Sequence, residues 1–151
     1  MPKIIYSNLE ENDTNAMYHA IWQFKEAYKR CFMPYPLFYN GVVKVLFVPG
    51  VVNLAFALEL EMKYLSLIYK GRYICNKHDL DLLFYDLPNN ILKDSYFREK
   101  EYVKENLESA SKVFTEARYD FQEGNSYGLE HKNFIEAVEI KMFEFVEKSR
   151  I

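Results

Sequence analysis

Apolar residues recur at alternating steps of three and four over most of the chain, which is the period of an amphipathic α-helix. The clearest stretch runs from Val51 to Lys70. Its apolar seam consists of Val51, Ala55, Leu58, Met62, Leu65 and Tyr69. Further apolar residues widen the seam and leave one narrow polar stripe, made of Glu59, Lys63, Ser66 and Lys70. A helix that is apolar on nearly every side belongs at the centre of a bundle.

The same period predicts three more long helices and one short helix around this central one. They are expected from Asp13 or Thr14 to about Met33, from Asp79 to Pro88, from Tyr96 to Gln122 and from Leu129 to Lys148. Pro49 and Gly50 mark a break before the central helix. The connections are short, and we therefore expect an all-α fold. It is an antiparallel helical bundle of four main helices plus a short helix, in a single domain over residues 1–151.

One segment does not follow the helical period. Residues 37–48 are rich in valine, which favours extended structure, and Asn40 with Gly41 is a turn signal. This segment predicts either a short β-hairpin near residues 37–48 or an apolar loop that lies over the bundle.

Charge and composition narrow the classes of function. The net charge is −3 with acidic and basic residues mixed along the chain, so no global attraction to nucleic acid exists, although a local basic pocket is compatible with it. The two cysteines, Cys31 and Cys75, are far apart in the sequence and indicate a reducing compartment. The chain shows neither a signal peptide nor about 20 continuous apolar residues, so we expect a cytoplasmic protein with no membrane contact.

Local motifs for the common enzyme classes are absent. The sequence contains no phosphate-binding glycine loop, zinc signature or serine elbow, so we expect no metal and no cofactor. The remaining candidates are single polar residues in helical contexts. Glu59 and Lys63 lie one turn apart and form either a solvated ion pair or part of a polar groove between helices. Glu61 stands among apolar residues, which predicts a raised pKa, a subunit interface or a basic partner.

Two further polar sites have both structural and chemical interpretations. Asp79 can cap the short helix while His78 packs against the preceding turn, or His78 can act in acid–base chemistry. Arg118 lies on the polar edge of its predicted helix, together with Ser111. It either pairs with a carboxylate such as Asp120 or contacts a phosphate through its planar guanidinium.

Three runs of sequence resemble HEPN-type domains. Residues 53–65 resemble the second helix of these domains, residues 78–84 are similar to the segment that follows it, and residues 117–123 are similar to the arginine–tyrosine stretch on a later helix. The resemblance implies a helical bundle that often dimerises. It also implies metal-independent ribonuclease activity in toxin–antitoxin and phage-defence systems, in which an arginine contacts the phosphate and a histidine five to seven positions later activates the ribose 2′-hydroxyl.

The chain departs from the HEPN pattern after the arginine. The histidine positions that follow Arg118 hold Glu123, Gly124 and Asn125. Glu123 stands where a base is needed, but a carboxylate there repels phosphate. Arg72 and His78 have the family spacing, but they lie between two helices.

These observations leave three functions open. The first is a homodimeric HEPN-like module that is non-catalytic or weakly active, binds RNA or a nucleotide or a partner protein, and works in a toxin–antitoxin or phage-defence setting. The alternatives are a metal-independent endoribonuclease with Arg118 in an interhelical cleft and a small-molecule-binding helical domain. The candidate catalytic residues are Arg118, His78, Asp120 and Glu123, and the candidate substrate-binding residues are Glu59 and Lys63.

Overall fold

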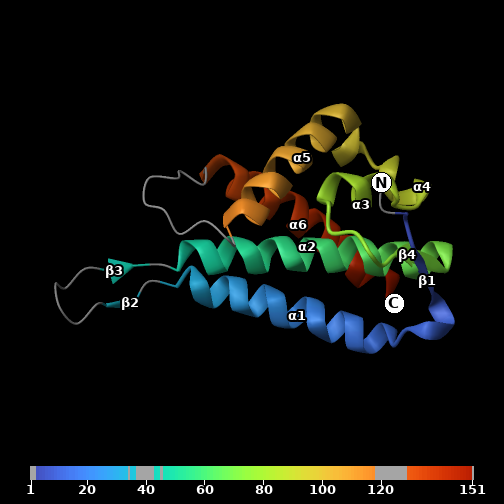
Figure 1. The fold of residues 1–151 in the computed structure, drawn as a ribbon, viewed down its shortest axis with the longest axis horizontal. Coiled ribbons are helices and arrows are strands. Elements are labelled where there is room, and N and C mark those ends of the chain that lie inside the picture. The colour runs from blue at the N-terminus through green and yellow to red at the C-terminus, as the bar shows by residue number, and fades with distance from the viewer. Residues whose placement is uncertain (1–2, 34, 37–42, 45, 118–128, 151) are drawn as a thin grey trace.

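The computed structural model describes residues 3–33, 35–36, 43–44, 46–117 and 129–150. Within these ranges the chain is an all-α bundle, as the sequence predicts (Figure 1). Its long helices are α1 (Thr14–Cys31), α2 (Phe47–Lys70), α5 (Lys100–Ala117) and α6 (Leu129–Ser149). Two short helices, α3 (Leu80–Tyr85) and α4 (Asn89–Leu92), and two 3-10 turns at Leu9–Glu11 and Ser95–Phe97 complete it. None of the described helices is long and apolar enough to cross a membrane.

Helix α1 runs antiparallel to both α2 and α6, which therefore run parallel to each other. Leu46, just before α2, donates its N–H to the Cys31 carbonyl at the end of α1, so these two ends lie together. Lys25 of α1 meets Glu139 of α6, and Tyr18 meets Glu147, which gives α6 the opposite direction to α1. The ring of Phe97, just before α5, lies 6.3 Å from that of Phe145, and the ring of Tyr102 lies 6.3 Å from that of Phe134, so α5 runs antiparallel to α6.

Helix α2 lies at the centre of the bundle, as its nearly continuous apolar surface predicts. It contacts α1, α3, α5 and α6, with α1 along one side and α3 and α5 along the other (Figure 1). Its buried residues include Leu54, Leu58, Met62 and Leu65, which pack with Ile21, Leu107, Val138 and Met142 from the surrounding helices.

The end of α2 was predicted correctly from the sequence, but its start was not. Gly71 ends the helix as predicted, with a left-handed φ of 77° that side chains disfavour, and its N–H bonds to the Leu67 carbonyl. The start was predicted too late, because Pro49 and Gly50 lie inside the first turn rather than before it. Proline is tolerated there, since its missing N–H has no helical partner in any case. Gly50 is needed because a Cβ would collide with the Phe32 ring.

Other boundaries also differ from the prediction. Helix α5 begins at Lys100 rather than near Tyr96, because Ser95–Phe97 form a 3-10 turn in which the Tyr96 N–H donates to the Asp94 carboxylate. Its predicted continuation to Gln122 lies outside the described residues. Pro88 was predicted to end the short helix. It is also the N-cap residue of α4, a helix that the sequence pattern does not predict.

Two short antiparallel strand pairs accompany the helices. Strand β2 (Tyr35–Pro36) pairs with β3 (Val43–Lys44), which is the hairpin predicted near residues 37–48, with its first strand slightly earlier. Strand β1 (Tyr6–Asn8) pairs with β4 (Arg72–Ile74), with Tyr6 opposite Ile74. The second pair was not predicted, and it ties the segment before α1 to the segment after α2.

Candidate functional site

Three of the predicted site residues, Glu59, Lys63 and His78, come together in what we call the α2 polar cluster. Lys63 Nζ lies 3.1 Å from Glu59 Oε2, and His78 Nδ1 lies 3.0 Å from the same oxygen. Glu59 and Lys63 stand one turn apart on α2, and His78 lies on the segment between β4 and α3. The sequence therefore identifies a set of side chains that the fold brings into contact.

Glu59 and Lys63 of the α2 polar cluster are buried, so they do not form a solvated ion pair. The side chains of Glu59 and Lys63 are only 9% and 6% exposed, whereas that of His78 is 66% exposed. The interpretation of Glu59 and Lys63 as a solvated stripe was therefore wrong, because α2 is covered on this side as well. An ion pair removed from water needs further hydrogen bonds to satisfy its charges, and the His78 imidazole supplies one to the carboxylate.

The Glu59 carboxylate orients the imidazole of His78. Carboxylate oxygens only accept hydrogen bonds, so His78 Nδ1 carries the proton in this contact and donates it. In this tautomer the lone pair is on Nε2, on a side chain that is largely exposed. A buried carboxylate that fixes the tautomer and orientation of an accessible imidazole is an arrangement suited to acid–base chemistry.

The start of α3 brings α5 close to this cluster. Asp79 occupies the N-cap position, but its carboxylate accepts no capping hydrogen bond, so the predicted capping role was wrong. Instead, the N–H of Leu80 donates to the Ser111 hydroxyl of α5 at 3.4 Å. Ser111 lies on the polar edge predicted for the helix that carries Arg118, and Leu80, which contacts it, is two residues after His78. Arg118, Asp120 and Glu123 themselves lie outside the described residues.

A second group of charges, the core charge cluster, lies on the opposite side of α2. It consists of Glu61 on α2, Glu139 on α6 and Lys25 on α1. Lys25 Nζ lies 2.5 Å from Glu139 Oε1, and both side chains are nearly buried. Glu61 is 0% exposed, and within the described ranges neither of its carboxyl oxygens has a hydrogen-bond donor. The expected subunit interface for Glu61 was therefore wrong, because the chain itself encloses this carboxyl. The expected basic side chain is present as Lys25, whose charge acts on Glu61 without a hydrogen bond to it.

The surroundings of Glu61 favour its neutral form. Burial raises the pKa of Glu61 well above its usual value, and the negative charge of Glu139 and a hydrogen bond to Glu139 raise it further. Lys25 lowers that pKa, but by less than the other effects raise it. As a carboxylic acid, Glu61 gains an O–H that donates to Glu139, which removes its lack of a partner. The core charge cluster is thus one neutral acid beside one ion pair.

Sequence reasoning missed Lys25 and Glu139. Glu139 lies four residues after Ile135 and three before Met142, both of which face the core, so the argument that singled out Glu61 applies to Glu139 as well. A cavity of about 360 Å³ between α1 and α6 is lined by Lys25 and Glu139, whereas Glu61 does not line it. The ion pair therefore borders this cavity, and the neutral acid lies deeper.

Comparisons with family models, with curated proteins and with solved structures give no match to this chain. The resemblance to HEPN-type domains therefore stays a prediction that rests on the three runs of sequence. Across the described ranges, no three His, Cys, Asp or Glu side chains gather closely enough to hold a metal ion.

Proposed function

We propose that this chain is a HEPN-like helical module that binds RNA or a nucleotide at the α2 polar cluster and cleaves RNA weakly through His78. The observation that supports this proposal best is the 3.0 Å contact between His78 Nδ1 and the buried Glu59 carboxylate. An imidazole that only packs against a turn needs no such partner. A general base needs one, because the carboxylate fixes the tautomer and stabilises the imidazolium that forms.

The proposed reaction is a transesterification within the RNA. His78 Nε2 accepts the proton of a ribose 2′-hydroxyl, whose oxygen bonds to the adjacent phosphorus. The bond from phosphorus to the 5′-oxygen of the next nucleotide breaks, and that oxygen takes up a proton. The products are a 2′,3′-cyclic phosphate and a 5′-hydroxyl end, and no net oxidation occurs.

Electrostatics at the cluster are compatible with a phosphate ligand. Lys63 neutralises the Glu59 carboxylate at 3.1 Å, so the pair presents no net negative charge to an approaching phosphate. Arg118 is proposed to contact the scissile phosphate, with Asp120 and Glu123 near it on the same stretch. These three roles come from the resemblance and stay predictions.

The test separates RNA binding from RNA cleavage. Fluorescence anisotropy measures binding of a mixed-sequence RNA, and gel analysis with a chelator present measures cleavage. We expect His78→Ala to lower the cleavage rate by about 100-fold or more, in line with the loss of a general base, with little effect on binding. Arg118→Ala is expected to weaken both without lowering thermal stability. His19→Ala is the matched control, because His19 is an exposed histidine on α1.

The outcomes discriminate between the functions. Binding without cleavage by the wild type would reduce the proposal to a non-catalytic binding module. Equal cleavage by the wild type and His78→Ala would remove His78 as the base. The absence of RNA and nucleotide binding by the wild type would overturn the proposal as a whole.

A second candidate, a homodimer that acts through protein contacts, is supported by apolar side chains on the α1 and α6 surface. Trp22 is 39% and Ile140 is 55% exposed, and the Trp22 ring meets the Phe143 ring edge-on at 5.3 Å. Sedimentation velocity is the test. We expect Ile140→Glu to convert a dimer to a monomer, while Tyr69→Glu, at an exposed apolar residue near the end of α2, leaves the dimer intact. A monomeric wild type would refute this candidate. A partner protein and a defence setting stay predictions.

A further inference from the structure

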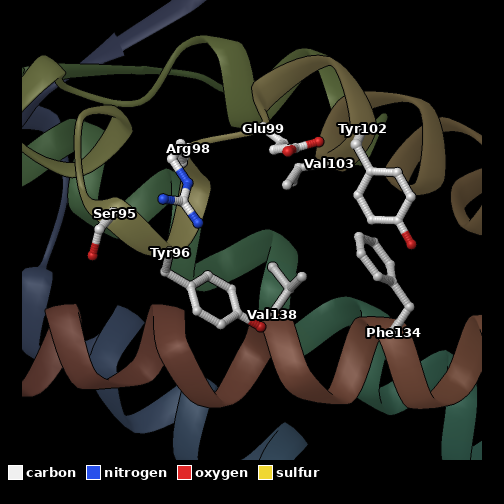
Figure 2. Close-up of a pocket in the computed structure, with 8 residues that line it drawn as sticks. All are labelled: Ser95, Tyr96, Arg98, Glu99, Tyr102, Val103, Phe134 and Val138. Carbon is white, nitrogen blue, oxygen red and sulfur yellow. The ribbon is translucent and has the colours of Figure 1, made fainter.

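A cavity of about 440 Å³ lies between the start of α5 and α6, away from both charged clusters. Its walls are mostly apolar and include Tyr96, Tyr102, Val103, Phe134 and Val138 (Figure 2). We call it the aromatic pocket. Its size is within the range of pockets that hold small organic ligands, and such pockets combine apolar walls with a few polar groups that orient the ligand.

Two opposite charges accompany these apolar walls. Arg98 and Glu99 both line the aromatic pocket, on the side formed by the start of α5 and opposite the α6 residues Phe134 and Val138 (Figure 2). Within the part of the chain that the structure describes, neither side chain forms an ion pair, although they are neighbours in sequence. Other charges on the bundle surface do pair, as Lys132 does with Glu136 on α6.

The aromatic walls are arranged to receive a ring. The ring of Tyr102 meets that of Phe134 edge-on, with 6.3 Å between their centroids. The side chains of Tyr96 and Tyr102 are 45% and 59% exposed, so a large part of each is open to solvent. Aromatic pairs prefer such edge-to-face and offset geometries, and a third ring can extend them.

We propose that the aromatic pocket binds a small zwitterion with an aromatic body, of the chemical class of an aromatic α-amino acid. The ligand carboxylate pairs with the Arg98 guanidinium through its planar donors, the ligand ammonium pairs with the Glu99 carboxylate, and the ring lies against Tyr102 and Phe134. A ligand with one charge would use only one of these two charged side chains. This inference is independent of the RNA function proposed for the α2 polar cluster.

Three matched probes test the charge assignment by titration calorimetry on the full chain. L-phenylalanine carries both charges, 3-phenylpropanoate carries only the carboxylate and 2-phenylethylamine carries only the ammonium. We expect saturable binding of L-phenylalanine, about tenfold tighter than either of the other probes, because each charged contact contributes on that order. No saturable binding of L-phenylalanine, or equal binding of all three probes, would overturn the proposal.

Two exposed substitutions then separate the contacts. Arg98→Gln should weaken the binding of L-phenylalanine and 3-phenylpropanoate about tenfold and leave that of 2-phenylethylamine unchanged. Glu99→Gln should weaken the binding of L-phenylalanine and 2-phenylethylamine about tenfold and leave that of 3-phenylpropanoate unchanged. Arg30→Gln and Glu26→Gln are the controls, since these residues form an exposed ion pair on α1 with 3.6 Å between the charged atoms. Circular dichroism checks that each variant stays folded. Equal effects of Arg98→Gln on the anionic and cationic probes would contradict the assigned roles.

Discussion

Replacement of Glu61 by glutamine gives a pH-dependent test of the core charge cluster. Glu61 is fully enclosed, and its pKa is raised mainly by burial and then by the negative charge of Glu139. Glutamine has almost the same shape, cannot ionise, and keeps an N–H₂ group that can donate to Glu139 as the carboxylic acid does. The substitution therefore removes the titration while it keeps the packing.

The sign of the effect follows from the direction of the pKa shift. In the unfolded chain Glu61 loses its proton near the usual pKa of about 4.3, whereas in the folded chain it keeps that proton to a higher pH. Between these two values the folded state binds more protons than the unfolded state. The free energy of unfolding of the wild type therefore falls as pH rises through this window, by about 1.4 kcal/mol per pH unit. Below the unfolded-state pKa the contribution of Glu61 to stability does not change with pH.

The magnitude is large compared with the stability of a small domain. Each pH unit within the window amounts to about 1.4 kcal/mol, against a total free energy of unfolding of about 5–15 kcal/mol. We expect Glu61→Gln to match the wild type near pH 4 and to become progressively more stable than the wild type as pH rises. Other titrating groups contribute almost equally to both proteins, so they cancel in the difference.

The assay is urea denaturation of both proteins at unit steps from pH 4 to pH 8. Glu105→Gln serves as the control, because Glu105 is exposed on α5 and its substitution should change stability by the same small amount at every pH. A stability difference between Glu61→Gln and the wild type that stays constant across this range would refute the reasoning. So would a difference that shrinks as pH rises.

Three further substitutions test the core charge cluster and the ends of α2. Lys25→Met should lower the free energy of unfolding by about 3–5 kcal/mol in urea denaturation, because Glu139 loses its partner in the core; a loss below 1 kcal/mol would contradict this. Gly50→Ala should destabilise by about 1–3 kcal/mol, seen as a lower Tm, because the added Cβ collides with Phe32; an unchanged Tm would show that the ring moves freely. Gly71→Ala should lower stability by about 1 kcal/mol because of its positive φ, and an increase would contradict the left-handed end of α2.

The helical bundle was predictable because its signal is local and repeated. In a long helix such as α2 the helical period of apolar residues repeats over several turns, and Gly71 marks the end of the helix. The start of α2 was harder, because proline and glycine are compatible with both a loop and a first helical turn. Phe32, which explains Gly50, is distant enough in sequence that no local pattern reveals the contact.

Contacts between distant segments were beyond sequence reasoning for a different reason. The pairing of β1 with β4 involves three residues on each side, too short for an alternating pattern, and its partners lie far apart in the chain. For the candidate site, the sequence identified Glu59, Lys63 and His78. It did not reveal that Lys63 and His78 both contact the Glu59 carboxylate. It identified Glu61 as unusual, but the identity of its neighbours depends on how α1 and α6 approach α2.

Glu59 and Glu61 stand two residues apart on α2, and successive residues are rotated by about 100° around a helix axis. One turn of a single helix thus carries the carboxylate that holds His78 on one side and the protonated acid of the core on nearly the opposite side. A rotation of α2 about its axis would displace both carboxyls, so the two sets of contacts together constrain the angular setting of the helix.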